Sequence, residues 1–187
     1  PIEFHNIYQE IQSSECILID LRYYPTTILD TIAKNLFPKN LAISEYTDPN
    51  ISHIGYTEVP NLDMLGSDNP NVFKGIIVAL VNHNTFSQGE YIALSLSSLE
   101  NTHIVGSKTS GTDGNIITIE LPLKMRGRFT AMTINYPNST PTFYVGVILD
   151  EEFNSDIIFL PGFDPELEQC LETIKENWHL WKTFVND

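Results

Sequence analysis

The segment NHNTFSQGEYIALSL, residues 82–96, places a serine and a glutamate at the start of an apolar helical pattern, directly after the run GIIVALV. Ser87 and Glu90 have the Ser-x-x-Glu spacing of a capping box, in which the hydroxyl and the carboxylate bind free backbone N–H groups at a helix start. A serine that follows a buried strand also presents its hydroxyl at the carboxyl edge of a sheet, where open α/β folds place their ligands. Ser87 is therefore both a candidate cap and a candidate nucleophile.

The elements that must position Ser87 are a strand, a helix and a second strand. Residues 75–82 predict the first strand, the helix follows Ser87, and the apolar run HIVGS predicts the second strand. This order indicates a parallel, right-handed crossover. The earlier run CILIDL predicts another strand covered on both faces, and Pro25 is suited to the first turn of the helix that follows it.

The second half of the chain is predicted to be rich in β-structure. The segments NIITIEL, RFTAMTIN and TFYVGVIL have the composition of strands and are separated by turns. Weaker strands are predicted near residues 41–46 and 51–59, followed by a loop over 60–71. Asp164 and Pro165 are suited to begin a final helix with one apolar stripe, made of Leu167, Leu171, Ile174, Trp178 and Trp181. The expected class is α/β, with parallel strand–helix crossovers, a β-rich segment and a C-terminal helix.

Composition narrows the functional classes. The 187 residues suit a single domain over 1–187, and a start at Pro1 without Met or a signal peptide suggests a portion of a longer protein. Acidic residues outnumber basic ones 24 to 10, and the net charge of −14 argues against nucleic acid and anionic membranes as partners. No apolar run approaches the ~20 residues of a membrane-spanning helix. No His, Cys or carboxylate cluster has metal-ligand spacing, so neither a metal nor another cofactor is expected, and Cys16 and Cys170 are interpreted as free buried residues.

Five segments, in order and spacing, resemble the core of the tail-specific, or C-terminal processing, serine proteases, especially their tricorn-like branch. CILIDLRYYPTT resembles the family segment Asp-Leu-Arg-x-Asn-Pro-Gly-Gly, and VNHNTFSQGEYIALSL resembles the nucleophile motif Thr-x-Ser-x-x-Glu. IVGSKTSGTDGNI resembles the loop Val-Gly-x-x-Thr-x-Gly, VGVILD stands where the family has Gly-Ile-x-Pro-Asp, and GFDPELEQCLETI resembles the closing helix. The resemblance covers about residues 15–175.

The resemblance implies a ClpP/crotonase-like core, the C-terminal catalytic portion of a longer protein, which cleaves a polypeptide through an acyl intermediate on Ser87. It implies an oxyanion hole made by the backbone amides of Gln88 and Thr26. It also implies an active-site loop that contains Gly111, Thr112, Asp113 and Gly114. An extracytoplasmic location is implied as well, and the protein is allowed to form an oligomer. Thr26 replaces the family's first glycine after Asn-Pro, and that position therefore loses the conformational freedom of glycine.

The catalytic base is not identified by the resemblance. Many relatives carry a lysine where this chain has Thr112, and tricorn-like relatives carry a glutamate near the place of Phe143. Their histidine would lie on a strand before Pro1, in an upstream segment of the same protein. Within the chain, His83 is the candidate base because it lies four residues before Ser87, and Lys108 is a weaker candidate. The missing groups leave an alternative open, a non-catalytic peptide- or lipid-binding module on the same fold.

Overall fold

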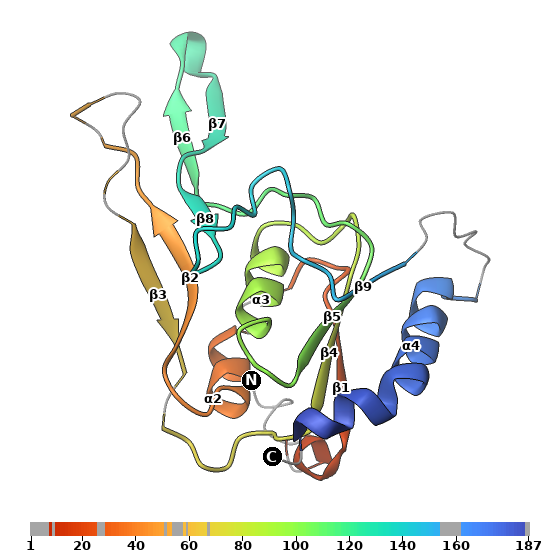
Figure 1. The fold of residues 1–187 in the computed structure, drawn as a ribbon. Helices are drawn as coiled ribbons and strands as arrows, with labels where there is room; N and C mark the ends of the chain where they lie inside the picture. The colour runs from red at the N-terminus through yellow and green to blue at the C-terminus, as the bar shows by residue number, and fades with distance from the viewer. Residues whose placement is uncertain are drawn as a thin grey trace.

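The structure is a computed structural model that describes residues 8, 10–25, 29–50, 52–53, 58, 60–66, 68–153 and 162–185. Its central element is a four-stranded sheet with the strand order β1-β4-β5-β9 (Figure 1). The strands are β1 (Cys16–Asp20), β4 (Ile76–Val81), β5 (Thr102–Gly106) and β9 (Glu151–Glu152), and each neighbouring pair is parallel. The predicted α/β class with a parallel sheet is confirmed.

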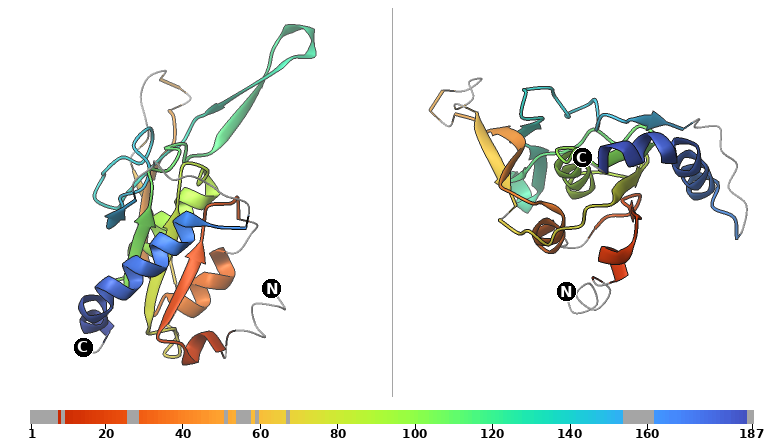
Figure 2. Two further views of the ribbon diagram at one scale, coloured as in Figure 1. Left: turned by 90° about the vertical axis from the view of Figure 1, so that its right-hand side faces the viewer. Right: turned by 60° about the horizontal axis from the view of Figure 1, so that its bottom comes forward.

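Strand β4 lies at the centre of the core, and all six of its residues are buried. Alternate side chains point to opposite faces of the sheet, as the pleat requires. One set, Ile77, Ala79 and Val81, packs in a cluster with residues of α2 (Leu29–Leu36) and α3 (Gln88–Leu96). The other set, Ile76, Val78 and Leu80, packs in a cluster with Cys170 and Trp181 of α4 (Pro165–Trp181), which crosses the sheet in Figure 2. Helices on both faces explain why this strand is a continuous apolar run.

The predicted crossover from β4 through α3 to the parallel strand β5 is confirmed. Its two strands end side by side, with Val81 in register with Gly106. Gly106 has φ 133°, and a Cβ atom there would lie 1.9 Å from the carbonyl oxygen of Val81, so only glycine fits. Tight pairing at this edge fixes the point from which the chain turns toward Ser87.

A second layer of β-structure flanks α3. Strands β3 (Asn61–Leu65), β2 (Leu41–Thr47) and β8 (Thr133–Asn135) form an antiparallel sheet in that order. A hairpin of β6 (Ile116–Glu120) and β7 (Arg126–Thr130), joined by the 3₁₀ turn η1 (Pro122–Lys124), extends away from the body in Figures 1 and 2. The hairpin exposes large apolar side chains, namely those of Ile116, Ile117, Ile119, Leu121, Leu123, Met125 and Phe129.

Several local predictions are corrected. The segment TFYVGVIL, residues 142–149, is not a strand but an irregular turn in which Tyr144 has φ 64°. RFTAMTIN is divided between β7 and β8, and β3 lies inside the predicted loop 60–71. The predicted strand over 51–59 falls largely outside the described residues.

The final helix α4 is confirmed at its start, where Asp164 accepts a hydrogen bond of 3.0 Å from the backbone N–H of Leu167. Its predicted apolar stripe is wrong at Leu171, which is 38% exposed, because the helix buries Cys170 instead. Cys16 and Cys170 are both free, as predicted, but only Cys170 is buried and Cys16 is partly exposed. A short 3₁₀ helix, η2 (Lys182–Val185), follows α4. Within the described part of the chain, no helix has the length and apolar character needed to cross a membrane.

Candidate functional site

Ser87 occupies a sharp turn between β4 and α3 and has φ 48° and ψ −116°. A left-handed φ is unfavourable for a residue with a side chain, and such conformations cost of order 1–3 kcal/mol. An ordinary N-cap residue instead has extended backbone angles. The Ser87 backbone therefore differs from that of a simple helix cap. It resembles the strained strand-to-helix turn at which α/β-hydrolases hold a nucleophilic serine.

Hydrogen bonds within the turn hold this conformation. The Thr85 hydroxyl donates to the carbonyl oxygen of Leu21 at 2.9 Å and accepts from the backbone N–H of Asn82 at 3.0 Å. The Thr85 N–H also donates to the carbonyl oxygen of Asn82 at 2.8 Å. These bonds connect the turn to the end of β1, so the two strand ends position Ser87 together.

Ser87 and Glu90 have a capping-box arrangement, but only one half of it is a hydrogen bond of good geometry. The Ser87 backbone N–H donates to Oε2 of Glu90 at 3.2 Å. The Ser87 side chain also faces the Glu90 N–H as a capping box requires, but this approach does not reach the geometry of a hydrogen bond among the described contacts. Ser87 therefore keeps the capping-box arrangement, and its role as a nucleophile rests on its backbone conformation and on the cavity beside it.

Glu90 is fully buried and connects α3 to the glycine loop, residues 107–114. Its Oε1 accepts from the Thr109 hydroxyl and from the Gly111 N–H, each at 2.6 Å, and its Oε2 accepts from the Thr112 N–H at 2.8 Å. Gly111 has φ 65°, and a Cβ atom there would lie 2.8 Å from the carbonyl carbon of Tyr144. Glu90 thus fixes the loop beside the start of α3.

A cavity of about 500 Å³ opens beside Ser87 and is also bordered by the glycine loop. Its walls come from β2, β3, α3, the glycine loop and the segment around β8. They are formed by Ser44, Tyr46, Asp48, Asp63, Ser87, Gln88, Tyr91, Asp113, Gly114, Asn115, Met132 and Ile134. The volume lies within the range of small-ligand sites. The structure therefore brings Ser87, Gln88, Asp113 and Gly114 to one cavity.

Asp113 is the most perturbed carboxyl group of this cavity. The residue is 3% exposed, and its Oδ2 has no hydrogen-bond partner among the described residues. Burial, with a further contribution from the negative charge of Glu90, raises the pKa of Asp113 from 3.8 to about 7, although the N–H of Gly114 partly offsets this rise. The resemblance placed Asp113 in the active-site loop, but sequence reasoning missed its environment, because burial and the charge of Glu90 both arise from the tertiary fold.

The remaining predicted site residues lie elsewhere or outside the description. His83 is exposed and borders a different cavity of about 390 Å³, together with Arg22, Asp164 and Glu166. Thr26 lies outside the described residues. Gly111 and Thr112 donate hydrogen bonds to Glu90 but do not line the Ser87 cavity.

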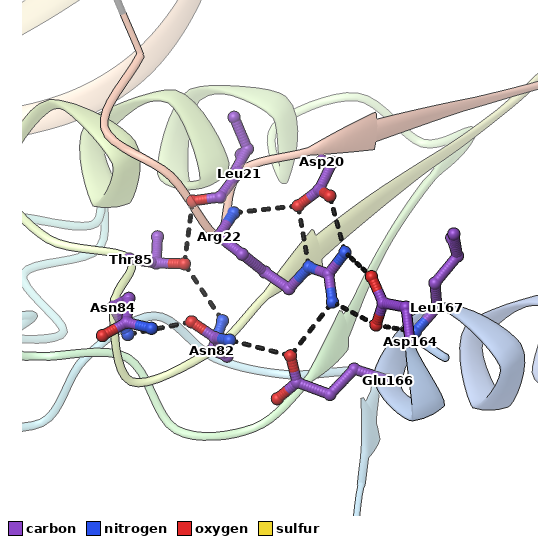
Figure 3. A network of polar contacts seen from close by, with 9 residues as sticks. All are labelled: Asp20, Leu21, Arg22, Asn82, Asn84, Thr85, Asp164, Glu166 and Leu167. Atoms are coloured by element: carbon purple, nitrogen blue, oxygen red, sulfur yellow. Dashed lines mark hydrogen bonds and ion pairs between the residues drawn. The ribbon is translucent and has the colours of Figure 1, made fainter. Parts of the chain in front are cut away.

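Sequence reasoning also missed an ionic network centred on Arg22, which is 6% exposed, although the side chains of Asp20 and Asp164 are partly exposed (Figure 3). Its guanidinium group donates to Asp20 and Asp164, with shortest distances of 2.7 Å, and to Glu166 at 3.1 Å. The bonds to Asp164, and then those to Asp20, raise the pKa of Arg22. Asn82 joins the network through a 2.8 Å bond to Glu166. The network links the ends of β1 and β4 to the start of α4, and so supports the turn that carries Ser87.

A comparison with models of known protein families identifies one family. The family model described as peptidase family S41 matches residues 3–153. No curated protein matches the chain.

Solved structures share the fold. A candidate peptidase from Parabacteroides merdae has a TM-score of 0.79 and 17% identity, over 92% of this chain and 56% of that one. Mature CPAF complexed with lactacystin has a TM-score of 0.73 and 14% identity, over 99% of this chain and 47% of that one. The photosystem II D1 C-terminal processing protease has a TM-score of 0.59 and 16% identity, over 81% and 38%. The chain thus spans about half the length of the first structures it matches.

Proposed function

The chain belongs to peptidase family S41, and we propose that it forms the core of a serine peptidase in which Ser87 attacks the carbonyl carbon of a peptide bond. The observation that carries this proposal is the left-handed backbone of Ser87 at the mouth of a cavity. A strained turn persists only where the surrounding structure maintains it, and such turns cluster at functional sites. A cap alone would require neither the strain nor the cavity.

The proposed reaction is acyl transfer. As the Ser87 oxygen bonds to the carbonyl carbon, its proton passes to a base, and the carbonyl oxygen becomes an oxyanion. Gln88 is the first residue of α3, and N–H groups at a helix start lack intrahelical acceptors. The N–H of Gln88 would therefore stabilise the oxyanion, together with the N–H of Thr26. Collapse then expels the amine, which takes the proton, and water hydrolyses the ester on Ser87.

The base is proposed to come from outside the described residues. No His or Lys is among the residues that line the Ser87 cavity, and the His83 side chain belongs to the neighbouring cavity. The family resemblance predicts a histidine on an upstream strand of the same protein. An extracytoplasmic location and cleavage near unstructured C-termini are part of the same proposal and are supported by the resemblance alone.

The alternative is a binding module that retains the fold without the reaction. Thr112 at the place of the family's lysine favours it, because Thr112 uses its N–H to bind Glu90 and offers no basic group. The two functions differ in whether a covalent bond to Ser87 is required.

The test is the cleavage of an internally quenched, unstructured peptide by the full-length gene product. Ser87→Ala should lower the rate by roughly a thousandfold or more, because serine and base act as a unit. Ser97→Ala is the matched control, since Ser97 is an exposed residue at the other end of α3. Equal cleavage rates for the wild type and Ser87→Ala would reject Ser87 as the nucleophile, and a folded wild type that cleaves nothing would reject the proposal and favour the binding module.

A further inference from the structure

The cavity beside Ser87 is acidic. Three carboxylate side chains line it, those of Asp48, Asp63 and Asp113, while its described lining contains no Lys, Arg or His. The buried carboxylate of Glu90 lies close enough to affect the titration of Asp113 and adds to the negative potential. Negative groups gathered in a cavity without a cationic partner repel one another, and a bound cation would relieve that repulsion.

Asp113 provides a second, independent indication of a ligand. Its side chain is buried at the cavity wall, and its Oδ2 lacks a hydrogen-bond donor within the described structure. A buried acceptor without a donor costs about 1–3 kcal/mol. A ligand that brings N–H groups into the cavity would supply that donor once the Asp113 carboxyl group turns toward the cavity that it lines.

Asp63 is held in place by an aromatic neighbour. The Tyr91 hydroxyl donates to Oδ2 of Asp63. Burial, and then the bond to Asp63, raise the pKa of Tyr91, so the phenol remains a donor at neutral pH. Because Tyr91 belongs to α3, the same helix that begins after Ser87 also orients this carboxylate.

The other walls suit an alkyl chain with a charged end. Tyr46 and Tyr91 supply aromatic side chains, a type that attracts cations as well as methylene groups, and Met132 and Ile134 supply apolar side chains. A long basic side chain has this combination of an apolar stem and a cationic head.

We propose that this cavity is a subsite for a Lys or Arg side chain of the polypeptide, next to the bond that Ser87 attacks, with Asp63 and Asp113 as the carboxylates that bind its cationic head. The identity of the ligand as a peptide substrate rests on the proposed function. The preference for a cation can be measured without any reaction.

The first experiment measures the binding of n-butylguanidinium and of its neutral isostere, n-butylurea, to the chain by titration at pH 8. The cation should bind at least about tenfold more tightly, which corresponds to about 1.4 kcal/mol. Asp63→Asn and Asp113→Asn should each lose most of that preference, while Glu176→Gln should retain it. Glu176 is an exposed residue of α4, so this control removes the same charge far from the cavity.

Equal binding of the two ligands would overturn the proposal, and so would an unchanged preference in both Asn variants. Thermal melts of each variant show whether it is folded, and Asn can still accept the hydrogen bond from Tyr91. The second experiment compares cleavage of quenched peptides that differ only by Arg, norleucine or Glu beside the bond. Cleavage without a preference for Arg contradicts the subsite and leaves the peptidase in place. Selective cation binding without any cleavage supports the subsite and contradicts the proposed function.

Discussion

Replacing Asp113 by Asn tests whether the glycine loop holds a carboxyl group in an unfavourable environment. Burial and the charge of Glu90 raise the pKa of Asp113 from 3.8 to about 7 in the folded protein. Between these two values the unfolded chain is ionised while the folded protein keeps its proton. The free energy of unfolding therefore falls as the pH rises through this window, and the full loss is present above pH 7.

The size of the effect follows from the pKa values. Each pH unit inside the window corresponds to about 1.4 kcal/mol, and the whole rise to about 4 kcal/mol at most. The isoelectric point is about 4.5, so measurements near that pH risk precipitation and should begin at pH 5.5. From pH 5.5 to 8, the wild type should lose about 2 kcal/mol relative to Asp113→Asn, which has no carboxyl group to titrate at this position.

Urea unfolding of the two proteins at half-unit pH steps measures this difference. The Asn amide can have an unfavourable free energy of its own, but that contribution does not change with pH. The stability of Asp113→Asn relative to the wild type should thus rise by about 2 kcal/mol, or about 4–8 °C in Tm for a chain of this size. Glu176→Gln should show no such rise. A constant difference between Asp113→Asn and the wild type from pH 5.5 to 8 would refute the reasoning.

Substitutions at Arg22, Glu90 and Gly106 test the contacts around the site. Arg22→Met should lower the free energy of unfolding by about 2–3 kcal/mol in urea titrations, because it leaves the buried Glu166 without its cation, whereas Asp20 and Asp164 are exposed enough to be hydrated. Arg22→Lys should recover only part of that loss, and equal stability of the wild type and both variants would contradict this reasoning. Glu90→Gln should lower the free energy of unfolding by about 2–3 kcal/mol and speed the hydrogen exchange of the Gly111 and Thr112 amides, which donate to Glu90. Unchanged exchange of these amides would show that Glu90 does not hold the loop. Gly106→Ala should prevent folding, because its Cβ atom would lie 1.9 Å from a backbone oxygen. Gly162 has φ 80° but no atom within 4 Å of such a Cβ, so Gly162→Ala should lower the free energy of unfolding by only about 1–2 kcal/mol, as measured by thermal melts.

The elements that rest on local pattern could be predicted. The buried run of β4, the helix after Ser87 and the capped start of α4 each carry their own signal in period, cap or composition. The segment 142–149 was predicted wrongly because its strand-like composition is overridden by tertiary contact. There the Tyr144 N–H donates to the carbonyl oxygen of Gly111 at 2.8 Å, and the chain bends around the glycine loop.

Site features that depend on distant pairs could not be predicted. Arg22 and Asp164 are separated by 142 positions in sequence, and nothing in either local segment indicates that they meet. The environment of Asp113 likewise depends on burial by the folded chain, and then on the charge of Glu90, which is distant in sequence. Ser87 was identified from its local motif, but its left-handed backbone became visible only in the structure.

The central claim is that Ser87 is a nucleophile whose base lies outside the described residues. Its most direct test is reaction with a fluorophosphonate probe, followed by mapping of the modified peptide by mass spectrometry. The full-length gene product should carry one phosphonyl group on Ser87, the Ser87→Ala variant should carry none, and the 187-residue chain should react slowly or not at all. Modification of another residue, or a folded full-length protein that resists the probe, would contradict the claim. Rapid labelling of the 187-residue chain would instead place the base within it.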